Sequence, residues 1–169
     1  MKEKKNIAVY PGTFDPPTYG HLDIIKRASS IFDKVIISIS ADSVKNTTFS
    51  IKEREEMLRV ITRELKNVEV TSFKGLLVNF LKNKKSRIII RGLRAVSDFE
   101  YEFQLALTNR KLDNSIETVF FIPDETYTYL SSSLVKEIIR LNGNIDKLVP
   151  PIVKFYLEKK LKKTLDNYN

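Results

Sequence analysis

The side chains of this sequence that are best suited to chemistry lie in short polar stretches, each of which follows an apolar run. The first stretch, residues 10–21 (YPGTFDPPTYGH), leads into a helix that we expect to start near His21. A helix N-terminus offers unpaired N–H groups and about half a positive charge. Thr13 adds a hydroxyl donor, and Gly20 would let a ligand approach the backbone. The stretch predicts an anion site with His21 at its rim. The alternative is a structural histidine bonded to a nearby carbonyl.

Basic side chains follow two further apolar runs. Lys45 lies in a polar loop after the second run, and Arg91 and Arg94 come directly after three consecutive isoleucines. A guanidinium group can bind a phosphate through two parallel hydrogen bonds, so we interpret the arginines as phosphate ligands. A plain surface position is the alternative for Lys45. For the arginines, the alternative is an ion pair with one of the nearby carboxylates, Asp98, Glu100 or Glu102.

The last polar stretch ends in three serines. Residues 127–133 (YTYLSSS) precede a segment with helical spacing of its apolar residues. One serine suffices to cap a helix, so three supply extra hydroxyls beside the N–H groups of the first turn. We interpret them as a second anion site, with a purely capping cluster as the alternative.

Alternating elements must position these stretches. We expect strands at residues 7–10, 35–40, 68–72, 88–90 and 119–122, where β-branched residues cluster. We expect helices at 22–30, 51–65, 76–82, 99–111 and 134–141, where apolar residues recur every three or four positions. The pattern predicts an α/β fold with a doubly wound, five-stranded parallel sheet. In such sheets ligands bind at the carboxyl ends of the strands, which is where the polar stretches lie.

Local signals define the ends of several helices. Ser50 with Glu53, and Ser97 with Glu100, match the capping box. Gly143 is expected to stop the fifth helix. A terminal helix is expected from about Pro151. We find no linker or repeat, so the sequence predicts a single domain over residues 1–169.

Composition narrows the class of protein. The chain has 29 basic and 21 acidic residues, a formal charge of +8, which suggests an anionic partner. Cysteine is absent and His21 is the single histidine, so neither a disulfide nor a multi-histidine metal site can form. No glycine pattern matches a dinucleotide-binding or P-loop motif. No apolar run suits a signal peptide or a membrane span, so we expect a cytoplasmic protein without membrane contact.

Several of these motifs together resemble a known family. Residues 18–21 (TYGH) resemble the [HT]-x-G-H signature of nucleotidyltransferases related to class I aminoacyl-tRNA synthetases. Combined with residues 10–16 (YPGTFDP), 90–94 (IRGLR), 98–102 (DFEYE) and 131–137 (SSSLVKE), they are similar to bacterial phosphopantetheine adenylyltransferases over Ile7 to about Pro150. The resemblance implies a Rossmann-like nucleotidyltransferase fold, transfer of the adenylyl group of ATP to 4′-phosphopantetheine to give dephospho-coenzyme A and pyrophosphate, Mg²⁺ as cofactor, and a homohexamer.

The resemblance also implies roles for individual residues, with His21, Thr13, Lys45 and Arg91 as the catalytic set. Those implied to bind ATP are Thr13, Phe14, His21, Gly92, Leu93, Arg94, Glu102, Tyr127, Thr128, Tyr129, Leu130, Ser131, Ser132 and Ser133. Those implied to bind the acceptor are Thr13, Lys45, Leu77 and Arg91. No residue is assigned to a metal. The sequence departs from the family pattern at residues 42–44 (DSV), where a proline-containing segment is more usual, and at Tyr127, a common tryptophan position.

The chemistry so implied needs no general base, because a phosphate acceptor is largely ionised at pH 7. Positioning and neutralisation of charge must carry the reaction. The histidine stretch alone would also suit transfer to nicotinamide mononucleotide or glycerol phosphate, and the later motifs favour phosphopantetheine. A nucleic-acid-binding protein is disfavoured because aromatic and basic residues do not interleave. A tRNA synthetase is disfavoured by the length of 169 residues.

Overall fold

The computed structural model describes residues 5–42, 46–94 and 96–162, with the side chains of residues 96, 97 and 162 left out. Its centre is a five-stranded sheet in the order β3-β2-β1-β4-β5, and all of the pairings are parallel. The strands are β1 (Ile7–Gly12), β2 (Lys34–Ser40), β3 (Val68–Phe73), β4 (Ile88–Gly92) and β5 (Glu117–Phe121). The doubly wound parallel sheet predicted from the sequence is confirmed.

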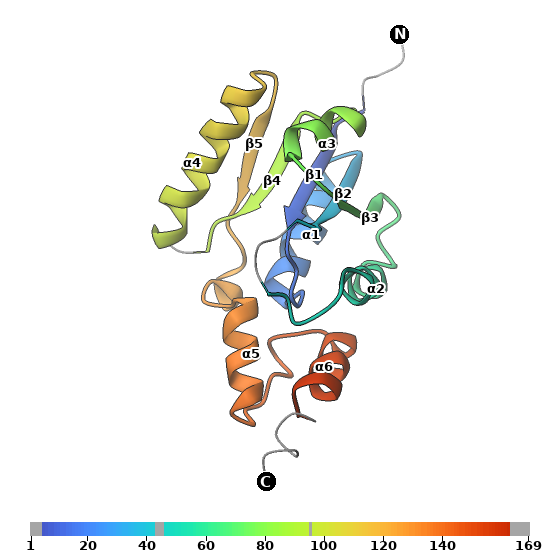
Figure 1. Cartoon of the computed structure of the whole chain (residues 1–169), viewed down its shortest axis with the longest axis vertical. Helices are drawn as coiled ribbons and strands as arrows, with labels where there is room; N and C mark the ends of the chain where they lie inside the picture. The colour runs from blue at the N-terminus through green and yellow to red at the C-terminus, as the bar shows by residue number, and fades with distance from the viewer. Residues whose placement is uncertain (1–4, 43–45, 95, 163–169) are drawn as a thin grey trace.

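Helices cover both faces of this sheet (Figure 1). They are α1 (Tyr19–Ile31), α2 (Ile51–Ile61), α3 (Leu77–Asn83), α4 (Val96–Leu112), α5 (Ser132–Arg140) and α6 (Pro151–Leu157), with a 3₁₀ turn η1 (Glu125–Tyr127) and a π-helical segment η2 (Glu158–Lys162). Side chains of α1 and α2 pack on one face, and those of α3 pack on the other. None of the helices in the described ranges is long and apolar enough to cross a membrane.

The central strands are apolar on both sides because both of their faces are buried. In β2, Ile37 packs toward α1 and α2, while its neighbour Ile36 packs toward α3. A third apolar cluster joins α5 and α6 to Phe49 and Met57. Figure 1 shows α5 and α6 together beyond the carboxyl ends of the strands. They therefore form one wall of the space in which a ligand of this fold binds.

The helix ends confirm some local predictions and correct others. Ser50 and Glu53 form the expected capping box, and α6 begins at Pro151. The Ser97 prediction is wrong, because α4 begins at Val96 and position 97 is already helical. Helix α2 ends at Ile61 rather than at residue 65, because the Thr62 hydroxyl bonds back to the Leu58 carbonyl and a turn follows.

The stop after α5 also differs from the prediction. Asn142, at φ 58°, takes the left-handed position that we expected of Gly143. The Gly143 N–H instead bonds to the Ile138 carbonyl at 2.8 Å, which completes a Schellman motif. A Cβ at position 143 would lie 2.5 Å from an Ile138 methyl, so glycine serves close packing here.

Candidate active site

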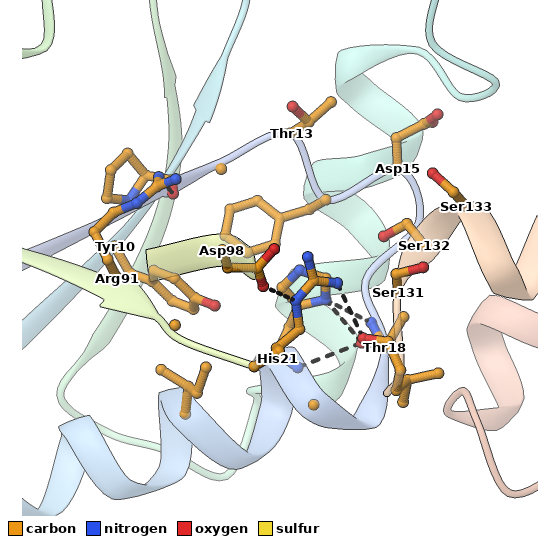
Figure 2. A pocket seen from close by; sticks show the side chains of 18 of the residues that line it. Tyr10, Thr13, Asp15, Thr18, His21, Arg91, Asp98, Ser131, Ser132 and Ser133 are labelled. Atoms are coloured by element: carbon orange, nitrogen blue, oxygen red, sulfur yellow. Dashed lines mark hydrogen bonds and ion pairs between the residues drawn. The ribbon is translucent and has the colours of Figure 1, made fainter. Parts of the chain in front are cut away.

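A cavity of about 640 Å³ opens at the carboxyl ends of the strands. Residues from the β1–α1 loop, the loop before α2, the start of α3, the end of β4, helix α4 and the segment leading into α5 line it. Figure 2 shows His21 near its centre, Tyr10 and Arg91 to one side, and Asp15 with Ser132 and Ser133 to the other. The polar stretches singled out in the sequence thus face one space.

The β1–α1 loop turns sharply into this cavity. Phe14 takes a left-handed backbone conformation at φ 49°, and its ring is buried against Tyr10 at a centroid distance of 5.3 Å. A Cβ at Gly12 would lie 2.9 Å from that ring, so only glycine lets the ring fold back over the strand end. The turn places Thr13 at the edge of the cavity (Figure 2).

His21 is the third residue of α1 and has its orientation fixed by Thr18. The Thr18 hydroxyl accepts the His21 N–H, and the His21 Nδ1 accepts the Thr18 N–H at 3.1 Å. A backbone N–H can only donate, so the ring proton of the neutral imidazole lies on Nε2. The alternative of a histidine bonded to a carbonyl is therefore wrong. The ring completes a capping box and keeps one donor for a ligand.

The electrostatic surroundings keep this imidazole neutral. Burial lowers the pKa of His21 to about 4, and the charges of Arg94 and Arg91 lower it in the same direction. At pH 7 the ring therefore offers an uncharged Nε2–H to any anion in the cavity.

Strand β4 runs to Gly92 rather than ending at residue 90, so Arg91 lies within the strand and Arg94 lies just beyond it. Both arginines are paired with carboxylates of α4. Arg91 bonds to both oxygens of Glu102 and donates to the Pro11 carbonyl at 3.1 Å. Arg94 donates to Asp98 at 3.1 Å and to the Leu130 carbonyl. The ion pairs expected under the alternative interpretation therefore form. Arg91 makes its bonds with three of the five N–H groups that a guanidinium carries. Both side chains still line the cavity.

The three serines at the start of α5 differ in their hydrogen bonds. Ser131 caps the helix by accepting the Leu134 N–H, and Ser132 donates to the Pro16 carbonyl at 2.7 Å. Ser133 is exposed and lines the cavity. The capping interpretation holds for Ser131, while the first turn of α5 still presents hydroxyl and N–H groups to the cavity.

Tyr127, at the position that departs from the family pattern, lines the cavity and stacks on Tyr19 with ring centroids 6.2 Å apart. Gly20 lies beneath it, and a Cβ there would come within 3.4 Å of the Tyr127 Cβ. The stack rests on the apolar cluster of α5 and α6, so the C-terminal helix supports this wall of the cavity.

The predicted site residues fall into three groups. Those that line the cavity are Thr13, Phe14, His21, Leu77, Arg91, Gly92, Arg94, Glu102, Tyr127, Leu130, Ser131, Ser132 and Ser133. Leu93, Thr128 and Tyr129 do not line it: the Leu93 N–H pairs with Phe121 beyond β4, and Tyr129 is 86% exposed. Lys45 lies outside the described residues.

Several lining residues were not singled out from the sequence. The polar ones are Tyr10, Asp15, Thr18, Ser40, Asn46, Thr47, Tyr101 and Lys136. For Lys136 a signal existed, because it lies four residues after Ser132 and shares its face of α5. For Asp15 the signal was its place in the β1–α1 loop.

The carboxylates of the cavity have partners within the protein. Asp15 pairs with Lys136, Asp98 with Arg94, and Glu102 with Arg91. Among the residues that the structure describes, no group of three or more His, Cys, Asp or Glu side chains could hold a metal ion.

Comparison with known proteins agrees with this geometry. The sequence model of the cytidylyltransferase-like family matches residues 9–138, which hold most of the cavity, so fold and site define a nucleotidyltransferase of this class. A phosphopantetheine adenylyltransferase of Thermodesulfovibrio yellowstonii is 56% identical over 156 residues, covering 92% of this chain and 97% of the relative. One of Caldanaerobacter subterraneus is 52% identical, covering 94% of this chain and 99% of the relative. The chain belongs to the phosphopantetheine adenylyltransferase family.

A solved structure from Vibrio parahaemolyticus, described as a candidate nicotinate-nucleotide adenylyltransferase, also matches. It superposes with a TM-score of 0.71 over 94% of this chain and 95% of its own, at 17% sequence identity. This likeness shows that the fold is that of a nucleotidyltransferase.

Proposed function

We propose that this protein transfers the adenylyl group of ATP to 4′-phosphopantetheine, forming dephospho-coenzyme A and pyrophosphate in coenzyme A biosynthesis. One observation carries the proposal: His21, Arg91, Arg94 and the N-terminus of α5 face a single cavity. The family membership then selects the acceptor, because the relatives named above are phosphopantetheine adenylyltransferases.

In the proposed reaction an oxygen of the acceptor phosphate forms a bond to the α-phosphorus of ATP. The bond from that phosphorus to the bridging oxygen breaks, and pyrophosphate leaves with the electron pair. The attacking phosphate is largely ionised at pH 7, so no side chain has to remove a proton. The main obstacle is bringing two anions into line, which fixed positive groups and donors overcome.

His21 is proposed to stabilise the charge that develops on the α-phosphate. Its Nε2–H is the free donor of a neutral ring whose other nitrogen is held by Thr18. Because the capping box fixes the ring before substrate arrives, little reorganisation is needed during the reaction. The Thr13 hydroxyl is proposed to contact both substrates from the opposite rim of the cavity.

Arg91, Lys45 and Leu77 are proposed to bind the acceptor. Arg91 is held rigid by Glu102 and the Pro11 carbonyl. Burial alone would lower its pKa, but the Glu102 carboxylate raises the pKa above the usual value, so the guanidinium stays charged. The role of Lys45 follows from the family resemblance alone.

The nucleotide is proposed to lie along the other side of the cavity. Gly92 and Arg94 at the end of β4, together with Tyr127 and Leu130, would hold the adenosine. The first turn of α5 would receive the pyrophosphate, because its N–H groups and hydroxyls favour an anion. Mg²⁺ is proposed to bind the phosphates and water, since the carboxylates that line the cavity are already paired.

A homohexamer in the cytoplasm is proposed as the working state. Helix α4 supports self-association, because large apolar side chains on it are exposed: Phe99, Tyr101, Phe103, Leu107 and Leu112. Such a patch on a soluble enzyme commonly marks an interface. The cytoplasm supplies ATP. Light scattering should give six times the 19.6 kDa chain mass, and a monomer would contradict the assembly.

Pyrophosphate release tests the function directly. The purified protein is incubated with Mg²⁺, ATP and one acceptor at a time: 4′-phosphopantetheine, nicotinamide mononucleotide or glycerol phosphate. Release that depends on 4′-phosphopantetheine is expected. Turnover with another acceptor but not with this one would contradict the proposal.

A further inference from the structure

Three segments that line the cavity meet at the carboxylate of Asp15. Its Oδ1 accepts the Phe49 N–H at 2.8 Å, and its Oδ2 accepts the Thr48 N–H at 2.9 Å. The ammonium group of Lys136, in the second turn of α5, donates to the same Oδ2 at 2.9 Å. The β1–α1 loop, the loop before α2 and helix α5 are thereby joined at one residue.

The two charged side chains of this junction are largely buried. Asp15 is 5% exposed, and the side chain of Lys136 is 18% exposed. Burial alone would raise the pKa of Asp15, but the hydrogen bonds from Thr48, Lys136 and Phe49 outweigh burial and hold the pKa below its usual value. The carboxylate is therefore charged at neutral pH, and both of its oxygens are occupied by protein donors.

The joined segments serve different substrates in the proposed reaction. The loop before α2 contributes Asn46 and Thr47 to the cavity, and it follows Lys45, which is proposed to bind the acceptor. Helix α5 carries the serines on the pyrophosphate side. Figure 2 shows Asp15 next to Ser132 and Ser133, across the pocket from Arg91. The junction therefore ties the loop before α2 to helix α5.

We propose that Asp15 is a positioning residue which, through Lys136, sets the acceptor loop against helix α5, so that the two phosphates meet in line. This inference rests on the proposed function. In-line attack requires reacting atoms about 3–3.5 Å apart, and a displacement of about 1 Å can cost on the order of 100-fold in rate. The ATP side keeps anchors of its own, because Ser132 is bonded to Pro16 and Arg94 to Leu130.

The test compares steady-state kinetics with ATP binding in matched variants. Asp15→Asn and Lys136→Met remove the charged contact, and Lys136→Arg restores a cation. Lys154→Met is the control, because Lys154 also pairs with an aspartate, Asp146, but does not line the cavity. For each variant, kcat and KM for 4′-phosphopantetheine are measured by pyrophosphate release, and the Kd of ATP by calorimetry.

We expect Asp15→Asn and Lys136→Met to raise the acceptor KM at least about 10-fold and to lower kcat by roughly 10- to 100-fold. The Kd of ATP should stay within about 3-fold, Lys136→Arg should recover most of kcat, and Lys154→Met should match the wild type. An unchanged acceptor KM in folded Lys136→Met, or an equal loss of ATP affinity, would overturn the inference. If Asp15→Asn does not fold, the two Lys136 variants alone decide whether the inference holds.

Wild-type turnover separates this inference from the proposed function. If the wild type releases no pyrophosphate with 4′-phosphopantetheine, the proposed function fails. If it does and the Lys136 variants behave like the control, the function stands and the positioning role is refuted.

Discussion

Replacing His21 separates the two roles that the structure gives to its ring. His21→Ala removes the Nε2–H donor that faces the cavity and also the Nδ1 acceptor that satisfies the Thr18 N–H. Losing one preorganised donor to a developing charge costs about 2.7–4 kcal/mol, or roughly 100- to 1,000-fold in turnover. Losing the capping contact costs about 0.5–2 kcal/mol of folding stability.

His21→Gln is the matched variant. Glutamine at the third position of a helix is the usual partner in a capping box, so its side-chain oxygen can accept the Thr18 N–H. The variant should recover the unfolding free energy that His21→Ala loses. It should not recover turnover, because its flexible amide group cannot reproduce the position of the imidazole Nε2–H.

The assays are urea unfolding for stability, pyrophosphate release at saturating substrates for turnover, and calorimetry for ATP affinity. Turnover is compared at a temperature at which all of the variants are folded. We expect ATP to bind both variants with little loss. Turnover of His21→Ala within about 5-fold of the wild type, or full recovery of turnover in His21→Gln, would refute the role of His21 at the α-phosphate.

Three further predictions concern acceptor binding, packing at Gly12 and the titration of His21. Lys45→Ala and Arg91→Ala should weaken the acceptor step by roughly 10- to 100-fold, the value of a charge-assisted hydrogen bond. Kinetics and ATP titration check this, and a collapse of ATP affinity instead would reverse the assignment. Gly12→Ala should destabilise the fold by about 1–3 kcal/mol in urea unfolding, because its Cβ would lie 2.9 Å from the Phe14 ring; an unchanged midpoint would argue against that packing. Between pH 6.5 and about 4 the unfolded chain protonates His21 while the folded chain does not. The unfolding free energy should therefore decrease by about 1–3 kcal/mol as the pH is lowered through this range. His21→Gln should lack this component, and equal slopes for the two proteins would contradict the lowered pKa.

The sequence was sufficient to predict the sheet and the position of the site within it. Each of the expected strands is present. The runs in β1, β2 and β4 are mostly apolar because both faces of these central strands are buried. The edge strands β3 and β5 are less buried and were found from their β-branched and aromatic residues. Parallel topology then brings the carboxyl ends together. For that reason His21, Arg91 and the serines could be assigned to one cavity although more than 100 residues separate the first from the last.

Contacts between distant side chains were beyond sequence reasoning. Lys136 and Asp15 are 121 positions apart, and their pairing depends on the path of two loops that no periodicity encodes. The capping role of His21 was missed because histidine is not the usual third residue of a capping box. Asn142 was missed because glycine is the commoner left-handed residue, and the packing of Ile138 that requires Gly143 is tertiary.

Several of the hydrogen bonds that hold the segments around the cavity end on main-chain oxygens. Arg91 holds the carbonyl of residue 11, Arg54 that of residue 13, Ser132 that of residue 16, and Arg94 that of residue 130. A carbonyl is present whatever amino acid occupies a position, so substitutions in the loops leave these ties intact. Evolution, or an engineer, can therefore vary the loop residues to suit a different acceptor while the architecture around them stays fixed. The tolerance ends at the four anchoring side chains, at Asp15, whose carboxylate joins three segments, and at Gly12, where a Cβ would meet the Phe14 ring.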